Sequence, residues 1–257
     1  MHSALRDRLW AARNQLALAF GFLTILPVPQ VDYQPGALGR AGRWFPLAGL
    51  VIGCLLSMAH GGLSHIFPPL LVASLTVTLW AALTGGLHLD GLADCCDGLL
   101  AATSRERRLE IMRDPRTGAF AVIGSVLFLG LKVAALASVP AALPVLLLAP
   151  TWARYLLLWV ARQPLARPNG LGADFAAGLT RQTLQWALLL PLLLLALFPS
   201  LYSLTAFVLS ASSAFFLIRI IHTRLGGMTG DVYGLLVEMS ELIVLLTFAA
   251  RFVPPVG

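Results

Sequence analysis

Long runs of apolar residues, separated by short polar or basic stretches, dominate the chain. Six of these runs are long enough to cross about 30 Å of hydrocarbon as helices, and they lie near residues 44–60, 69–88, 118–139, 141–160, 182–200 and 201–221. Two more, near 9–27 and 239–253, are short or broken. The pattern predicts an all-α, polytopic integral membrane helical bundle with six transmembrane spans and one or two short, broken or interfacial helices at its ends.

The composition agrees with a membrane protein. Of the 257 residues, 58% are hydrophobic and 12% are charged, whereas a soluble domain is about half apolar and about a quarter charged. The excess of Leu and Ala over Thr, Tyr and Val argues against a β-barrel. No repeat, low-complexity tract or interdomain linker divides the chain, so residues 1–257 are expected to form a single membrane-embedded domain.

Basic residues gather in alternate connections between the apolar runs. The basic connections lie at 104–116, at 161–181, around Arg40 and Arg43, and around Arg219 and Arg224. The turns between them, at 60–69, 138–144 and 198–202, contain no Lys or Arg. The positive-inside bias therefore places the first set on the cytoplasmic side. An excess of arginine in cytoplasmic loops also explains the net charge of +6, so this charge does not indicate a nucleic-acid partner.

The first apolar segment, 9–27, is not expected to cross the membrane. Arg6, Arg8 and Arg13 lie before the segment or near its start, and Arg40 and Arg43 follow it. Because both flanks then belong on the cytoplasmic side, the segment is either an amphipathic helix in the interface or a hairpin broken at its prolines.

Half of the acidic residues fall in two short clusters at the cytoplasmic ends of apolar segments. The clusters are HLDGLADCCDG, with Asp90, Asp94 and Asp97, and TGDVYGLLVEMSE, with Asp231, Glu238 and Glu241. The predicted topology puts both clusters on the same side of the membrane.

Each cluster occupies one side of a helix. At about 100° per residue, Asp94 lies about 40° to one side of Asp90, and Asp97 about 20° to the other. In the second cluster Glu238 lies about 20° from Asp231, and the last acid about 80°. Solvated helix caps are the simpler explanation for a single acid, but three like charges on one stripe repel and need protonation or a bound cation.

Carboxylate oxygens without a His or Cys pattern favour Mg²⁺, with Mn²⁺ as the alternative ion. Two facing clusters could hold two such ions and clamp a phosphoryl group between them. The predicted metal ligands are Asp90, Asp94, Asp97, Asp231, Glu238 and Glu241. The predicted catalytic residues are Asp90, Asp94, Asp97 and His88, the last as a general base or as a partner of Asp90.

Arginines and glycines near the acids are candidates for phosphate binding. Arg113 and Arg116 flank an Asp-Pro pair and are placed to grip a diphosphate with planar forks. Arg105 is a further candidate, although with its neighbours it also fits a simple cytoplasmic anchor. The turn GGMTGD, with Gly227, Thr229 and Gly230, resembles a phosphate-cradling turn.

Together these stretches resemble a known family. GGLHLDGLADCCDGLL, RERRLEIMRDPRTGAFAVIG and GGMTGDVYGLLVEMSE look like the cobalamin synthase family, the adenosylcobinamide-GDP ribazoletransferases. FLTILPVP and RAGRWFPLAGLVIG are similar to the same family's opening, so the resemblance covers about residues 16–246. Ile25 departs from it where the family often has arginine, and Cys95 and Cys96 replace smaller or hydroxylated residues.

The resemblance implies a Mg²⁺-dependent transferase of the bacterial inner membrane. Its substrates would be adenosylcobinamide-GDP and α-ribazole or its 5′-phosphate, and its products GMP and adenosylcobalamin or its 5′-phosphate. A ribose hydroxyl would attack the cobinamide-side phosphorus in line with the leaving GMP. The sequence leaves a homo-oligomer open.

Two other classes share some of these features. A cation-coupled transporter also uses intramembrane carboxylates, but it would be expected to scatter them around the bilayer midplane, whereas here they gather at one face. A CDP-alcohol phosphotransferase also uses clustered aspartates with Mg²⁺. Its signature, DGxxAR followed by GxxxDxxxD, is absent.

Overall fold

The computed structural model describes residues 2–167 and 170–250, and they are helical with no β-strand within those ranges. A short 3₁₀ turn, Gly42–Trp44, joins α2 to α3. The helices are α1 (His2–Leu23), α2 (Ala37–Ala41), α3 (Phe45–Ser64), α4 (Pro69–Leu83), α5 (Leu87–Leu100), α6 (Arg105–Ile111), α7 (Ala119–Ser138), α8 (Ala142–Val160), α9 (Leu171–Gly178), α10 (Arg181–Leu197), α11 (Leu201–Leu225) and α12 (Gly230–Ala249). The predicted all-α fold is confirmed.

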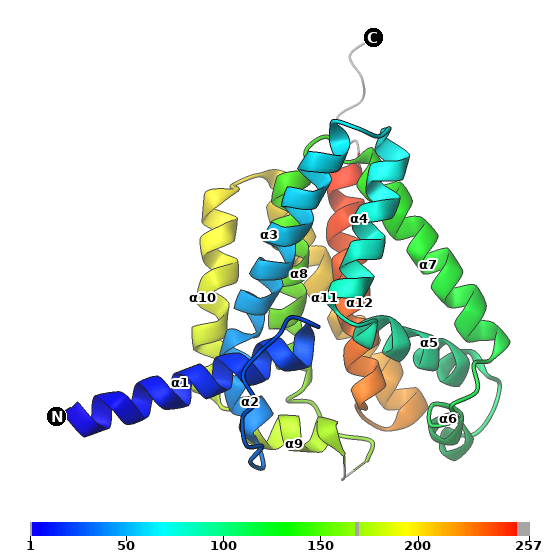
Figure 1. Cartoon of the computed structure of the whole chain (residues 1–257). Helices are drawn as coiled ribbons and strands as arrows, with labels where there is room; N and C mark the ends of the chain where they lie inside the picture. Colours follow the sequence, from blue (N-terminus) through cyan, green and yellow to red (C-terminus); the bar gives the residue numbers. More distant parts are fainter. Residues whose placement is uncertain (1, 168–169, 251–257) are drawn as a thin grey trace.

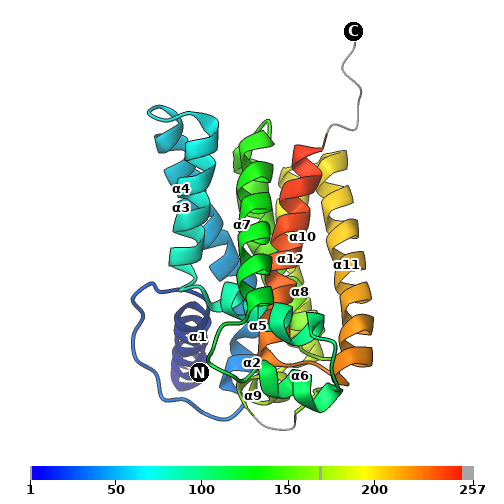
Figure 2. The same cartoon turned by 90° about the vertical axis from the view of Figure 1, so that its right-hand side faces the viewer.

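The long helices form a bundle around α8 and α12 (Figures 1 and 2). These two are the most buried, with 72% of the most apolar stretch of each covered by protein, against about a third or less in α7 and α11. The outer helices expose large apolar side chains such as Leu127, Leu193 and Phe216. A soluble protein rarely exposes so much apolar surface, so this belt is the surface that faces lipid.

Five helical stretches are long and apolar enough to cross a membrane: 37–64, which joins α2 to α3, and α7, α8, α11 and α12. Two more spans result if each bent pair, α4 with α5 and α9 with α10, is counted as one. The segment predicted near 239–253 is part of α12, which begins nine residues earlier. Acidic residues near the start of α12 make that part of the sequence look polar. Residues 251–253, the last three of the predicted segment, lie outside the described ranges.

The two ends of the bundle differ in character. At one end lie α1, α2, α5, α6 and α9; at the other are the turns 65–68, 139–141 and 198–200, which contain no Lys or Arg (Figure 1). Helix α1 lies across the bundle end and does not qualify as a span. This agrees with the interfacial helix predicted for 9–27.

Helix α5 lies across the end of α4 because the chain turns by 93° between them. Gly85 and Gly86 make this turn with φ values of 60° and 70°, a conformation that costs glycine little and other residues more. Because of this turn, α5 and its acidic stripe run nearly perpendicular to α4.

Helices α5 and α12 pack backbone to backbone. A Cβ added to Gly91 would lie 2.6 Å from the carbonyl oxygen of Asp231, and one added to Gly234 would lie 2.9 Å from that of His88. Only glycine allows this approach at either position. The packing brings the acidic stripe of α5 beside the first turn of α12.

Candidate functional site

The three aspartates of α5 share one face, as predicted. Asp90, Asp94 and Asp97 line a cavity of about 190 Å³, which we call the acid cavity. Its opposite wall is the loop between α6 and α7, including Arg113 and Arg116. The acidic stripe therefore faces an arginine-bearing loop at the basic end of the bundle.

Asp231 completes a group of four neighbouring carboxylates. Asp94 lies within electrostatic range of Asp231, Asp90 and Asp97. Neither the Asp90 nor the Asp94 carboxylate has a hydrogen bond or ion pair within residues 2–167 and 170–250. Two uncommitted acids beside two others repel one another unless they bind protons or a cation.

Asp97 is committed to the protein itself. Its two carboxylate oxygens accept hydrogen bonds from the backbone N–H groups of Gly118, at 2.6 Å, and Ala121, at 2.8 Å. These groups belong to the N-terminal turn of α7, where unpaired N–H groups attract negative charge. Asp97 therefore fastens α7 to α5.

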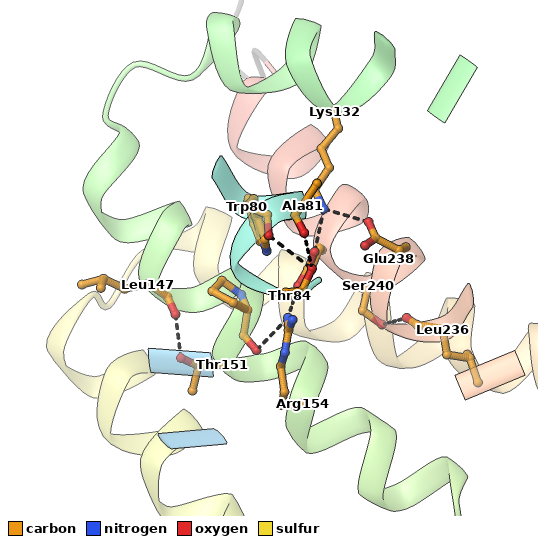
Figure 3. Close-up of polar contacts among 12 residues, drawn as sticks. Trp80, Ala81, Thr84, Lys132, Leu147, Thr151, Arg154, Leu236, Glu238 and Ser240 are labelled. Carbon is orange, nitrogen blue, oxygen red and sulfur yellow. Dashed lines mark hydrogen bonds and ion pairs between the residues drawn. The ribbon is translucent and has the colours of Figure 1, made fainter. Parts of the chain in front are cut away.

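Glu238 and Glu241 are paired with basic side chains, whereas a metal site shared with the aspartates would require them to lie beside those aspartates. Both lie buried within the bundle, where Lys132 Nζ of α7 is 2.8 Å from Glu238 and 2.6 Å from Glu241. Arg154 of α8 forms an ion pair with the other oxygen of Glu241. Figure 3 shows Lys132, Arg154 and Glu238 converging from three helices. We call these four residues the buried ion network.

Helical rise explains why the prediction placed these glutamates with the aspartates. Glu238 is seven residues after Asp231, so it shares the same face but lies about 10 Å further along the helix. Charges at that depth must be paired, and here two cations pair two anions. Within each cluster the acids share a direction around the helix, but the two glutamates lie deeper in the bundle than Asp231.

His88 is also turned inward. Its side chain is 3% exposed, and its Nδ1 has no hydrogen-bond partner among the described residues. Residues two apart on a helix point in different directions, and of these two only Asp90 lines the acid cavity. The charges with which His88 interacts most strongly are Arg154, Glu241 and Lys132 of the buried ion network. This position does not favour a general base for a reaction in the acid cavity.

The predicted phosphate-binding arginines separate into two groups. Arg113 and Arg116 both line the acid cavity, as expected, and Arg116 forms an exposed ion pair with Asp114 at 2.6 Å. The hydrogen bonds from Arg116 hold the pKa of Asp114 well below its usual range. Arg105 instead lies against Gly226 and does not line the acid cavity.

The turn GGMTGD is largely occupied by protein contacts. Gly227 packs against the backbone of Leu165 and Ala166, and the Met228 N–H donates to the Pro164 carbonyl oxygen. The Thr229 hydroxyl caps α12, accepting from the Val232 N–H at 3.4 Å, and donates to Asp231 at 3.2 Å. Gly230 has open space beside it and lines a second cavity.

This second cavity, which we call the α5–α12 cavity, also measures about 190 Å³. Asp90 lines both this cavity and the acid cavity. Its apolar wall is formed by Phe22, Leu38, Leu87, Leu157, Phe175 and Tyr233. A larger cavity of about 790 Å³ lies between α1 and the segment 28–33, and it shares Phe22 and Leu38 with the α5–α12 cavity.

Arg167 is a further basic residue near these acids that no sequence motif predicts. Its side chain donates to the Leu109 carbonyl oxygen at 2.6 Å, and its buried Nε has no partner among the described residues. Burial and the nearby Arg113 lower the pKa of Arg167, whereas Asp231 raises it. An unsatisfied guanidinium nitrogen close to a second arginine is suited to an anion. No local motif marks it, because these neighbours are distant in sequence.

Within the described part of the chain, no three His, Cys, Asp or Glu side chains converge closely enough to enclose a metal ion. The acids around the acid cavity therefore do not enclose a metal site by themselves within the described ranges. A cation there would need further ligands from water or substrate.

Replacing Gly91 with alanine is expected to separate α5 from α12. The new methyl group would contact the Asp231 backbone, so we expect a lower thermal midpoint and at least a tenfold loss of activity, a size typical of misplaced catalytic groups. Gly130→Ala on α7 is the matched control, because nothing lies within 4 Å of its Cβ position. Equal behaviour of the two variants would contradict the close packing.

The chain resembles one known family and several proteins that share a single name. The chain matches the family described as cobalamin-5-phosphate synthase over residues 15–249. An adenosylcobinamide-GDP ribazoletransferase from Pseudomonas paraeruginosa is 43% identical over 243 residues, which cover 93% of this chain and 98% of that protein.

Proteins of the same name occur in more distant bacteria. The one from Roseiflexus sp. is 38% identical, with 93% of this chain and 90% of that protein covered. The one from Deinococcus radiodurans is 42% identical, with 93% and 87% covered. No solved structure matches the chain.

Proposed function

The chain belongs to the cobalamin-5-phosphate synthase family and joins adenosylcobinamide-GDP to α-ribazole, and we propose that the acid cavity and the α5–α12 cavity together form its active site. The observation that carries this proposal is the position of Asp90, which lines both cavities. Two substrates bound one in each cavity would meet at this residue. Membership of the family favours neither the transporter nor the CDP-alcohol phosphotransferase.

The proposed reaction is an in-line phosphoryl transfer. A ribose hydroxyl of α-ribazole, or of its 5′-phosphate, forms a bond to the cobinamide-side phosphorus, while the bond to GMP breaks. The proton of the hydroxyl passes to a protein base, and GMP leaves with the bonding electrons. Such reactions depend on positioning and on stabilisation of negative charge more than on covalent chemistry by the protein.

Mg²⁺ fits the residues at the acid cavity, and Mn²⁺ shares the same preference for oxygen ligands. Mg²⁺ is usually bound through one or two carboxylates and completes its shell with water and substrate phosphate. Asp90 and Asp94 are uncommitted, and Asp231 is an electrostatic neighbour of Asp94, so carboxylates are available for this partial coordination. When bound, Mg²⁺ would neutralise phosphate oxygens as charge develops in the transition state.

Asp94 and Asp231 are the ligands that we propose for the ion. Asp97, which caps α7, positions the stripe, and the two glutamates stay outside the ligand set because they pair with Lys132 and Arg154.

Arg113 and Arg116 are proposed to bind the diphosphate from the opposite wall of the acid cavity, and Arg167, an electrostatic neighbour of Arg113, adds positive charge nearby. Guanidinium groups bind phosphate oxygens through paired, charge-assisted hydrogen bonds. We assign Arg105 to anchoring the loop, since it packs on Gly226.

Asp90 is proposed to accept the proton of the attacking hydroxyl. It is exposed, it lacks a protein partner in the described ranges, and it borders both cavities. A general base must lie within hydrogen-bond reach of the proton that it takes, and Asp90 is placed for this where the two cavities share a wall.

We further propose that the site faces the cytoplasm of the bacterial inner membrane. Support comes from the charge pattern: the turns at the opposite end of the bundle contain no Lys or Arg, whereas the loop segments near the acids are rich in arginine. Basic loops remain on the cytoplasmic side.

Removal of divalent metal is expected to stop transfer reversibly. Purified protein in lipid bilayers, incubated with adenosylcobinamide-GDP and α-ribazole, should release GMP with Mg²⁺, should stop with EDTA and should recover when excess Mg²⁺ or Mn²⁺ is added. Ca²⁺, which prefers larger and more flexible oxygen shells, serves as the control ion. GMP release that persists in EDTA would contradict the metal site, whereas absence of GMP under every condition would contradict the proposed function.

A further inference from the structure

We propose that the α5–α12 cavity is the binding site of the acceptor nucleoside, and that its apolar wall holds the benzimidazole base of α-ribazole. This assignment rests on the proposed function and adds to it which substrate occupies which cavity. It also names Tyr233 and His88 as the polar groups that the bound nucleoside would satisfy.

The cavity has the walls that a flat apolar base requires. Phe175 and Tyr233 meet edge to face, with ring centroids 6.0 Å apart, and Phe175 stacks on Phe45 at 5.3 Å. Leu87 and Leu157 add aliphatic surface. Sites for small molecules are typically apolar and aromatic, with a few polar groups that fix orientation. The benzimidazole base is bicyclic and uncharged at neutral pH, so it matches these walls.

Two buried polar groups in this cavity lack partners among the described residues. The Tyr233 side chain is 7% exposed and its hydroxyl has no hydrogen bond, and the same holds for Nδ1 of His88, which is 3% exposed. Leaving such buried groups unpaired is unfavourable, because they lose their hydrogen bonds to water and gain none in the protein. A nucleoside offers both a ring nitrogen and ribose hydroxyls, so it could satisfy both groups.

The polar edge of the α5–α12 cavity is the edge that it shares with the acid cavity, where the proposed reaction takes place. Asp90 and Asp231 line it, and Asp90 is shared with the acid cavity. A base held among the aromatic rings would therefore direct its ribose toward Asp90 and toward the diphosphate beyond it.

The guanosine half of the donor fits this cavity less well. A guanine base carries hydrogen-bonding groups along most of its edge, and apolar walls would leave them unpaired. In addition, Arg113 and Arg116, which are proposed to hold the diphosphate, line the acid cavity and not this one.

The decisive variant is Gly172→Leu, which adds bulk to the cavity from α9. A Cβ at Gly172 would lie 3.4 Å from Cε2 of Tyr233, an ordinary contact, and the rest of the leucine would enter the space proposed for the base. With the full-length protein in lipid nanodiscs, we expect the KM for α-ribazole to rise at least tenfold. The KM for adenosylcobinamide-GDP should change less than twofold.

Two further variants separate occupancy from folding. Gly130→Leu, on an exposed face of α7 with nothing within 4 Å, makes the same substitution and should leave both KM values unchanged. Tyr233→Phe keeps the ring and removes only the unpaired hydroxyl, so it should raise the KM for α-ribazole with little change in thermal midpoint.

The inference is overturned if Gly172→Leu leaves the KM for α-ribazole unchanged while the protein transfers normally, or if it raises the KM for the donor instead. In the second case GMP should also lose affinity for the variant, and the cavity would be assigned to guanosine. Absence of transfer by the wild-type protein would contradict the proposed function, and that result is distinct from either of these.

Discussion

Asp94→Asn is expected to reduce transfer by about a thousandfold or more, because loss of one preorganised electrostatic group at a reacting centre typically costs about 10²–10³ in rate, and here a metal ligand is lost as well. Asparagine keeps the shape of the side chain but removes its charge. Asp94 is only partly buried and has no hydrogen bond to lose within the described ranges. The variant should therefore insert and fold normally, and its thermal midpoint should stay within a few degrees of the wild type.

The matched control is Glu110→Gln, which neutralises an acid on the same end of the bundle. Glu110 is exposed and pairs with Arg107 at 2.8 Å, outside the residues that line the acid cavity. Its GMP release should stay within about twofold, since an exposed pair is worth about 0–1 kcal/mol. Full activity of Asp94→Asn at saturating Mg²⁺ would contradict the proposal that Asp94 is a metal ligand.

Glu241→Gln is expected to have the largest effect on stability. Glu241 bridges Lys132 and Arg154, so its neutralisation leaves two buried cations with a single carboxylate. Breaking a buried pair from one side costs about 3–5 kcal/mol. Reversible unfolding in mixed micelles should show a loss of this size.

Two comparisons make this prediction specific to the buried ion network. Glu238→Gln removes the carboxylate that contacts only Lys132, so the loss should be smaller. A variant that replaces both Arg154 and Glu241 with methionine should recover part of the stability, because no uncompensated charge from that pair remains. If Glu241→Gln folded as stably as the wild type and lost only activity, Glu241 would belong to the catalytic metal site after all.

Local and compositional features of this protein could be predicted well from sequence. Runs of apolar residues determine that it is a helical membrane protein, since a helix in lipid satisfies its own backbone hydrogen bonds. The stripe formed by Asp90, Asp94 and Asp97 follows from helical periodicity alone, and the structure shows it. The difference between the two ends of the bundle likewise follows from where arginine is present and where it is absent.

Some tertiary information was present in the sequence but was not used. Lys132 is the only lysine of the chain and lies in the middle of an apolar run, as Arg154 does in the next. Charged residues at such depth require partners. Glu238 and Glu241 are the acids in apolar surroundings, so the sequence already indicates them as partners of Lys132 and Arg154.

Only the tertiary structure decided which neighbours each acid has. Asp97 caps a helix that begins more than 20 residues later, and the ion pairs of Lys132 and Arg154 join residues 106 and 87 positions apart. Helical periodicity gives the direction of a side chain but not its depth or its partner across the bundle. Those depend on which helices pack together, and here the close contact at Gly91 and Gly234 sets α5 against α12 and leaves Asp90 between two cavities.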